Sequence, residues 1–325
     1  MHEMRKLSAL CFALMLAVLA GFPAVAEAQT WPQRPVKFIL PLGPGSGVDI
    51  GARLFADRLS ARWGKPVVVE NRPGGDGIVA ITAFLSARDD HTLLFSPTSS
   101  FTAHPYLHDK LPYDSSDLVP IARVSNTIVA VAVNDALKAR SVAELVAMAR
   151  AEPGKLNWAT ITGMFDFLFA GFLKNADLNI ARVPYRDPVS AANDLAEGRI
   201  ELMLSAIAIV RPQVERGKVR MIAVTASQRP AMAPDVPTVA EAGFPELTID
   251  GLTGVFSTPD MAADVRERIA AEIREVAAEP LIIQRLTATG QVVNPGTAAE
   301  FAAEIDKQRA QVAATGRLLG VKPAQ

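Results

Sequence analysis

Short apolar runs alternate along the first third of the chain with segments in which apolar residues recur every three or four positions. The runs at 36–40, 67–69 and 92–95 have the length and β-branched composition of buried parallel strands. Between them, one segment with helical spacing ends at Gly64, a suitable residue after a helix, and another covers 80–87. This alternation predicts a doubly wound α/β sheet.

A second series of the same kind follows. It starts with a strand-like run at 126–133, and Ser141 and Glu144 then match a capping box that opens a helix. The segment at 247–256 is predicted to be a strand that returns to the first domain, and the C-terminal part is predicted to be helical. The remaining strands of this series are expected at 156–160, 180–183, 200–204 and 219–225.

Composition narrows the class of protein. Of the 325 residues, 50% are hydrophobic and 21% are charged, which excludes a disordered chain. A formal net charge of −1 argues against a nucleic-acid partner, which normally needs a basic face. The length favours two domains. Cys11 is the only cysteine, and it precedes the mature part of the chain, so disulfides, thiol nucleophiles and Cys-ligated zinc are excluded from that part.

The N-terminus is predicted to be a secretory signal covering residues 1–28. Arg5 and Lys6 precede an apolar stretch at 7–22, which is short for a membrane anchor, and small residues at 26 and 28 provide a cleavage site. We therefore expect a secreted, periplasmic protein.

Two glycine-rich loops each connect a predicted strand to a predicted helix. At the carboxyl edge of a parallel sheet, such loops present backbone N–H groups and a helix N-terminus, which together favour an anion. A tight turn with a helix cap is the simpler alternative, since Ser46 and Asp49 match a capping box and Asp49 is then structural. A dinucleotide site is disfavoured because Val48 stands where the third glycine belongs. The loops comprise Pro44, Gly45, Ser46 and Gly47, and Gly74, Gly75, Asp76 and Gly77.

The order of several motifs resembles the Bug/TctC family, the periplasmic solute-binding receptors of tripartite tricarboxylate transporters. The similarity spans essentially the whole mature chain. Besides the first glycine loop, the motifs that carry the resemblance are those at 31–36, 66–74, 92–94, 111–114, 153–157, 183–185, 223–225, 234–238 and 241–243.

The resemblance implies an α/β fold of two doubly wound domains with the ligand enclosed in a cleft between them, as in periplasmic binding proteins. Domain 1 would comprise 29–127 and 253–325, and domain 2 would comprise 128–252. It also implies a carboxylate ligand held largely by backbone N–H groups and ordered waters. Carried over by position, the ligand-binding residues are those of the two glycine loops together with Thr98, Ser99, Ser100, Thr162, Gly163, Phe165, Asp166, Tyr185 and Ser205.

The chain departs from the family pattern at several of these positions. Asp76 replaces a glycine, Ser205 stands where many relatives carry Asp, and bulky residues at 164–167 replace small polar ones. The bulky residues at 164–167 favour a ligand with an apolar body, and the added carboxylate of Asp76 disfavours a second anionic group. Together they favour an aromatic or aliphatic monocarboxylate, with or without a hydrogen-bond donor, over citrate. In the alternative, Phe165 and Phe167 are core residues and Asp166 is a helix cap.

Other polar residues have simple interpretations. His104 and His108 are expected in a surface loop, because Pro105 separates them and no third histidine is near, so no metal and no cofactor is predicted. Arg72 and Arg186 could each approach a carboxylate or form a surface ion pair, and both interpretations stay open.

The predicted function is that of an extracytoplasmic solute-binding protein, a monomer and not an enzyme, which captures a small organic carboxylate. The resemblance implies integral membrane transporter subunits of the tripartite tricarboxylate type as partners. A receptor for a sensor kinase is the alternative within binding proteins. A secreted enzyme acting on a carboxylate is the alternative from another class, and the lack of a recognisable nucleophile–base pair weighs against it.

Overall fold

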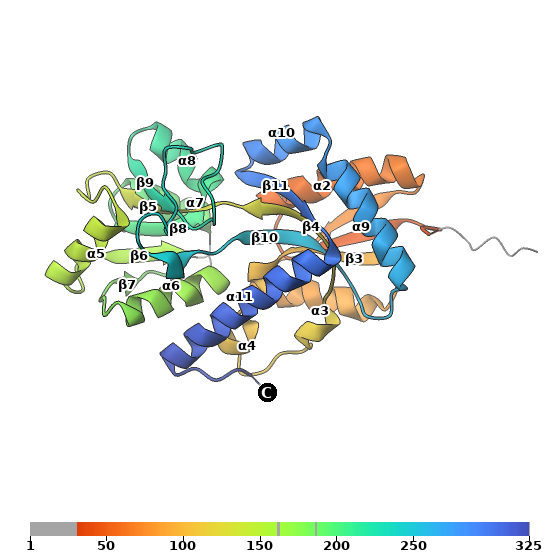
Figure 1. The fold of residues 1–325 in the computed structure, drawn as a ribbon, viewed down its shortest axis with the longest axis horizontal. Coiled ribbons are helices and arrows are strands. Elements are labelled where there is room, and N and C mark those ends of the chain that lie inside the picture. Colours follow the sequence, from red (N-terminus) through yellow and green to blue (C-terminus); the bar gives the residue numbers. More distant parts are fainter. Residues whose placement is uncertain (1–30, 161–162, 186, 325) are drawn as a thin grey trace, which may run out of the picture. The chain divides into compact units, whose positions relative to one another are not determined.

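The computed structural model describes residues 31–160, 163–185 and 187–324. The predicted signal sequence, Thr162 and Arg186 lie outside the described residues. Arg34–Gln325 form one compact unit that contains two sheets (Figure 1). Among the helices described, none combines the length and the apolar character needed to cross a lipid bilayer.

The first sheet has six strands in the order β11-β4-β10-β3-β1-β2. Its three parallel strands, which are next to one another, are those that the apolar runs predicted: β1 (Val36–Leu40), β2 (Val67–Asn71) and β3 (Thr92–Pro97). The antiparallel members are β4 (Val119–Thr127), β10 (Gly251–Ser257) and β11 (Gln291–Gly296). We call this sheet, with the helices that cover it, lobe one.

The helices of lobe one include α2 and α3, which follow the two glycine-rich loops. Gly64 ends α2 in the left-handed conformation, at φ 63°, as the sequence predicted. The helices are α2 (Gly47–Trp63), α3 (Ile78–Ala87), α4 (His104–Leu107), α9 (Ala263–Ala277), α10 (Pro280–Ala288) and α11 (Ala298–Leu319), with short 3-10 turns at Gly75–Gly77, Thr98–Ser100 and Ser115–Asp117.

The second sheet has five strands in the order β7-β6-β8-β5-β9, and we call it and its helices lobe two. The strands are β5 (Val129–Asn134), β6 (Asn157–Thr160), β7 (Ala181–Arg182), β8 (Leu202–Ala206) and β9 (Val219–Val224). The helices are α5 (Val142–Ala151), α6 (Met164–Asn175), α7 (Pro188–Ala196) and α8 (Ile207–Glu215), and a 3-10 turn covers Pro245–Leu247. Figure 1 shows α5 to α8 gathered around this sheet.

The predicted fold class is confirmed, with corrections where the chain passes between the sheets. The run at 126–133 is not one strand: it joins the end of β4 to the start of β5 through Ile128. The Ile128 N–H donates to the carbonyl oxygen of Gly290 over 3.2 Å, and its own carbonyl accepts from the Ile207 N–H. The return strand β10 begins at Gly251 rather than at 247, and it is antiparallel to its neighbours.

Helix α11 belongs to the cores of both lobes. Phe301, near its start, is buried with the apolar residues of lobe one, whereas Val312 is buried with those of lobe two. At Gly171 of α6, a β-carbon would lie only 2.4 Å from Cγ2 of Thr315, so the two helices approach closely at this point. The C-terminal helix therefore connects the lobes through packing as well as through the chain.

We expect Gly254→Ala to lower the free energy of unfolding by about 1–3 kcal/mol, because overpacking displaces neighbours. A β-carbon at Gly254 would lie 2.5 Å from the carbonyl oxygen of Ala122 and 2.4 Å from the ring of Phe301, and the carbonyl cannot move without disturbing the sheet. Urea unfolding measures the effect. Gly43→Ala is the matched control, since a β-carbon there meets nothing within 4 Å. Equal stability of the two variants would contradict the close packing at Gly254.

Candidate functional site

The first glycine-rich loop is held together by Asp49. The Ser46 hydroxyl accepts from the Asp49 N–H over 3.2 Å and so caps α2. The Asp49 carboxylate accepts from the Gly45 N–H, from the Asn71 amide and from Arg53, over 2.8–3.1 Å. Burial alone would raise the pKa of the Asp49 carboxyl, but these hydrogen bonds outweigh it and hold the pKa below its ordinary value. The predicted capping box is half right, since the carboxylate binds the N–H of Gly45 instead of that of Ser46.

The second glycine-rich loop meets the first at Gly77, together with the loop at 98–100 after β3, which we call the third loop. This residue is buried at φ 102°, a conformation that side chains rarely adopt. A β-carbon on it would lie 3.0 Å from the carbonyl oxygen of Ser100 and 3.4 Å from Cβ of Pro41. Only glycine allows the three loops, which follow β1, β2 and β3, to come this close.

The third loop is anchored through Thr98. Its hydroxyl donates to Oε1 of Gln308 over 2.6 Å, and the Gln308 amide donates to the carbonyl of Asp250 over 2.7 Å. Thr98 is fully buried, whereas Ser99 and Ser100 are partly exposed. The structure therefore gives Thr98 an internal partner and leaves the two serines nearer the surface of the loop.

The start of α6 in lobe two lies against these loops of lobe one. A β-carbon at Gly163, at φ 87°, would lie 2.8 Å from the carbonyl oxygen of Ser99 and 3.6 and 3.7 Å from the carboxylate oxygens of Asp76. Next to it, the Thr102 hydroxyl is 3.2 Å from the Met164 sulfur. Gly163 thus comes together with Asp76 and Ser99, which lie 87 and 64 residues before it and are predicted to belong to the same site.

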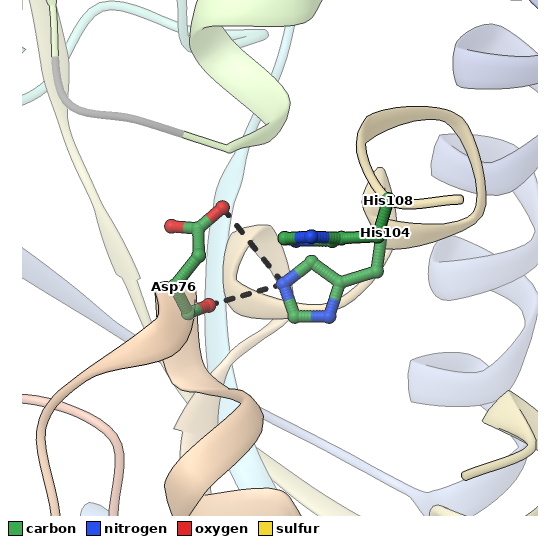
Figure 2. Close-up of side chains that lie close together, drawn as sticks. All are labelled: Asp76, His104 and His108. Carbon is green, nitrogen blue, oxygen red and sulfur yellow. Dashed lines mark hydrogen bonds and ion pairs between the residues drawn. The ribbon is translucent and has the colours of Figure 1, made fainter. Parts of the chain in front are cut away.

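His104 is fully buried, so its predicted place in a surface loop is wrong. It opens the short helix α4, and Figure 2 shows its ring beside Asp76, with His108 next to it. Its Nε2 is 3.0 Å from the carbonyl oxygen of Asp76, and its Nδ1 is 2.5 Å from the hydroxyl of Tyr113. Burial lowers the pKa of His104 to about 4, so the ring is neutral at pH 7.

The same residues form a group with the composition of a metal site. One atom each from Asp76, His104 and His108 lie within 4.8 Å of one another. A carbonyl oxygen can only accept a hydrogen bond, so Nε2 of His104 carries the proton and donates it to Asp76. A metal ligand must be an unprotonated nitrogen, and the geometry therefore fits a hydrogen-bonded structural histidine.

In lobe two, several predicted site residues are engaged within the lobe. Phe165 is buried in the apolar core, and Asp166 is paired with Arg182 over 2.5 Å. The Tyr185 hydroxyl donates to Asp194 over 2.6 Å, and burial together with this bond raises the pKa of Tyr185 to about 12. Thr162 lies outside the described residues.

Ser205 differs from these residues. It is the second-to-last residue of β8, is fully buried, and its hydroxyl has no hydrogen-bond partner within the described part of the chain. A buried hydroxyl without a protein partner is uncommon, and such groups are often found where a ligand or water binds.

Three cavities of about 650 to 690 Å³ lie elsewhere on the described residues. None of their linings includes a predicted site residue. One of them lies beside the strands that connect the lobes and is lined by residues such as Asn126, Ser227 and Asp250. The candidate site is thus defined by the meeting of the loops at Gly77 and Gly163.

Residues 51–317 match the family model described as the tripartite tricarboxylate transporter family receptor, TctC. The chain belongs to this family. It is 30% identical over 309 residues to protein BugT of Bordetella pertussis, in an alignment that covers 92% of this chain and 95% of BugT. The family resemblance read from the sequence is therefore confirmed, and the chain is a member of a family of solute-binding proteins.

Two solved structures share the fold of this TctC receptor. One is described as Rpa4515 of R. palustris with adipate, with a TM-score of 0.78, 24% identity and coverage of 90% of this chain and 99% of that chain. The other is MatC from Rhodopseudomonas palustris with bound malate, with a TM-score of 0.74, 24% identity and coverage of 87% and 100%. At this identity the likeness concerns the fold.

For one of the two arginines of this receptor, Arg72, the structure decides between a ligand contact and a surface ion pair. Arg72 pairs with Glu70, which also binds Lys37 over 2.8 Å, so Arg72 forms a surface ion pair. Arg186 lies outside the described residues. The pairing of His104 with Tyr113 was missed from the sequence, where the only signal was that both lie in one segment rich in proline and aromatic residues.

Proposed function

We propose that this TctC receptor captures a small organic carboxylate in the periplasm and delivers it to integral membrane subunits of a tripartite transporter. The observation that carries the proposal is the convergence of the loops after β1, β2 and β3 with the start of α6. The proposed contacts come from the loops at 44–47, 74–77 and 98–100, from Gly163 and Ser205, and from the further family positions Thr162, Phe165, Asp166 and Tyr185.

Backbone donors support a carboxylate as the ligand. Helices α3, α6 and α8 are preceded by the N-cap residues Gly77, Gly163 and Ala206, and none of these three provides a side-chain cap in the described part of the chain. The first N–H groups of a helix have no partner within the helix, and the helix dipole adds a partial positive charge. Helix N-termini of this kind are suited to binding a carboxylate group.

The strength of such bonds favours contacts from both lobes. Micromolar binding corresponds to about −8 kcal/mol, while each hydrogen bond to a charged group contributes roughly 1.5–3 kcal/mol and association costs about 4 kcal/mol or more. The few hydrogen bonds of one loop cannot supply both this binding free energy and the cost of association. We therefore propose that the domains predicted at 29–127 with 253–325 and at 128–252 enclose the ligand between them.

A thermal-shift screen against mono-, di- and tricarboxylates tests the proposal directly. Adipate and malate belong in it, because proteins of the same fold are described with them. A ligand present at 100 times its Kd stabilises the folded protein by about 2.7 kcal/mol. A rise in melting temperature with at least one acid is expected, and a panel with no effect up to 10 mM would refute the proposal.

For any acid that binds, we expect its methyl ester or amide to bind about tenfold more weakly or worse. The neutral derivative loses the charge that the helix N-termini favour and one of its two acceptor oxygens. Calorimetric titration of the acid and its ester under the same conditions measures the ratio. Equal affinities would show that the carboxylate is not what the site recognises.

A further inference from the structure

Helix α11 carries a buried amide in a stripe of apolar side chains. The helix buries Phe301 and Ile305 in the core of lobe one and Val312 in the core of lobe two, and Figure 1 shows it passing from the first sheet to the side of α6. Gln308 lies between Ile305 and Val312, at spacings of three and four residues on the same face, and is only 6% exposed. A buried amide destabilises a fold unless its polar atoms are hydrogen-bonded, so the partners of Gln308 are informative.

The amide group of Gln308 is bonded on both of its sides, to two parts of the chain with different roles. Its Oε1 accepts from the Thr98 hydroxyl over 2.6 Å, and its Nε2 donates to the carbonyl oxygen of Asp250 over 2.7 Å. Both distances are those of well-formed hydrogen bonds. One side chain thus joins two segments that lie 210 and 58 residues before it in the sequence.

Asp250 lies where the chain returns from lobe two to lobe one. Ile249, before it, is buried in the core of lobe two, and Leu252, after it, is buried in the core of lobe one. The Leu252 N–H also donates to the carbonyl oxygen of Asp250, over 3.0 Å. Hinges between domains are formed by a few residues at the ends of elements, and Asp250, just before β10, has such a position.

Thr98 is the residue on which the third loop is built. Its carbonyl oxygen accepts from the N–H groups of Phe101 and Thr102 and from the Thr102 hydroxyl, over 3.0–3.1 Å. The carbonyl of the next residue, Ser99, lies 2.8 Å from the position that a β-carbon of Gly163 would take, so this loop contacts lobe two directly. A shift of Thr98 would therefore alter the contact between the lobes at the candidate site.

We infer that Gln308 is a positioning residue that couples the third loop to the passage between the lobes at Asp250. Its two hydrogen bonds hold the loop and the main chain of the passage in one arrangement, and hydrogen-bond networks of this kind carry coupling between distant parts of a protein. The coupling is a property of the free protein. Its use in binding rests on the proposed function, in which the third loop contacts the ligand and the lobes enclose it.

Amide hydrogen exchange of the free protein tests the coupling. Thr98→Val replaces the hydroxyl with a methyl group of similar size, so it removes the bond to Gln308 without opening a large cavity. We expect exchange to become about tenfold faster in residues 98–102 and, at a distance, in residues 249–253 as well. Thr98→Ser keeps the donor and should leave exchange at 249–253 within about twofold of that in the wild type.

Gln308→Met tests the use of the coupling in binding, with Gln311→Met as the matched control. Gln311 is on the same helix and donates to the carbonyls of Glu246 and Thr248 over 3.2 and 3.3 Å. Adipate and malate are the first probes, and if neither binds the wild type, the acid of the panel with the largest rise in melting temperature replaces them. By calorimetry, Gln308→Met should bind the acid about tenfold more weakly than the wild type, and Gln311→Met should bind it as the wild type does.

The outcomes separate this inference from the proposed function. Faster exchange at 98–102 with unchanged exchange at 249–253 in Thr98→Val would overturn the coupling, and so would equal effects of Thr98→Val and Thr98→Ser at 249–253. Equal affinities of Gln308→Met and the wild type would overturn the role of Gln308 in binding and leave the carboxylate receptor standing. If no acid of the panel bound the wild type, the proposed function would fail, and exchange in the free protein would still decide the coupling. If Gln308→Met did not fold, the two Thr98 variants would decide it in the same way.

Discussion

Asp49→Asn should lower the free energy of unfolding by about 2–4 kcal/mol, because a buried carboxylate with several donors is replaced by an amide. The Asp49 side chain is only 3% exposed, and it accepts from the Gly45 N–H, from Asn71 and from Arg53. The amide of asparagine brings two donors into a site where the neighbouring groups also donate. Urea unfolding at pH 7 measures the loss.

The pH dependence identifies the carboxylate as the cause. The folded-state pKa of Asp49 is lowered, so its contribution to stability is complete above the ordinary pKa of an aspartate, near 4, and is lost as the pH falls through the lower folded value. The difference between the wild type and Asp49→Asn should therefore stay constant from pH 5 to 8 and shrink below pH 4. Asp57→Asn, on the exposed face of the same helix, is the control and should change stability by less than about 0.5 kcal/mol. Equal effects of the two substitutions would show that the network around Asp49 contributes nothing.

The parts of the fold that could be predicted are those in which local pattern and tertiary role agree. β1 and α2 follow an apolar run and a helical spacing, and Ser46 and Gly64 mark the ends of α2 by side-chain and backbone chemistry. The two glycine loops were visible for the same reason, since each stands between a strand and a helix. Local sequence was sufficient there because the interactions that matter are local.

Strand β4 was largely missed because its apolar run is interrupted by buried polar residues. Arg123 is only 7% exposed, yet it lies in the middle of the strand. It donates to the backbone carbonyl of Asn294 over 2.6 Å and to the side-chain oxygen of Asn294 over 3.0 Å, and it pairs with Glu304. These partners, about 170 residues away in the sequence, satisfy the buried guanidinium group, and no periodicity in the sequence predicts them.

In the candidate site, too, local sequence predicts some features and tertiary packing decides the others. The residues of each loop could be named from the sequence, but the closeness of Gly163 to Ser99 and Asp76 depends on how the lobes pack. Thr98 is predicted to contact the ligand, and the structure adds that its hydroxyl donates to Gln308, on the C-terminal helix. Which polar atoms of a loop face a ligand is decided by long-range hydrogen bonds, and only the structure shows these.

The stability of the protein should decrease between pH 6.5 and pH 4 through His104. The ring has a folded-state pKa of about 4, whereas an unfolded histidine titrates near 6.5. Between these values the unfolded chain binds the proton and the folded protein does not, so lowering the pH favours unfolding. The contribution is complete above about pH 6.5 and is lost towards pH 4, and by pH 4.5 the loss amounts to about 2–3 kcal/mol.

The comparison of two variants separates this titration from ordinary loss of packing. His104→Gln removes the titrating ring, so the change in unfolding free energy between pH 7 and 4.5 should be about 2–3 kcal/mol smaller than in the wild type. Tyr113→Phe removes the hydroxyl that donates to Nδ1 but keeps the buried imidazole, so its stability should be lower at every pH while most of the pH dependence remains. Urea titrations at half-unit steps of pH measure both. If His104→Gln retained the full pH dependence of the wild type, the neutral, buried state of His104, and with it the bond that holds Asp76, would be refuted.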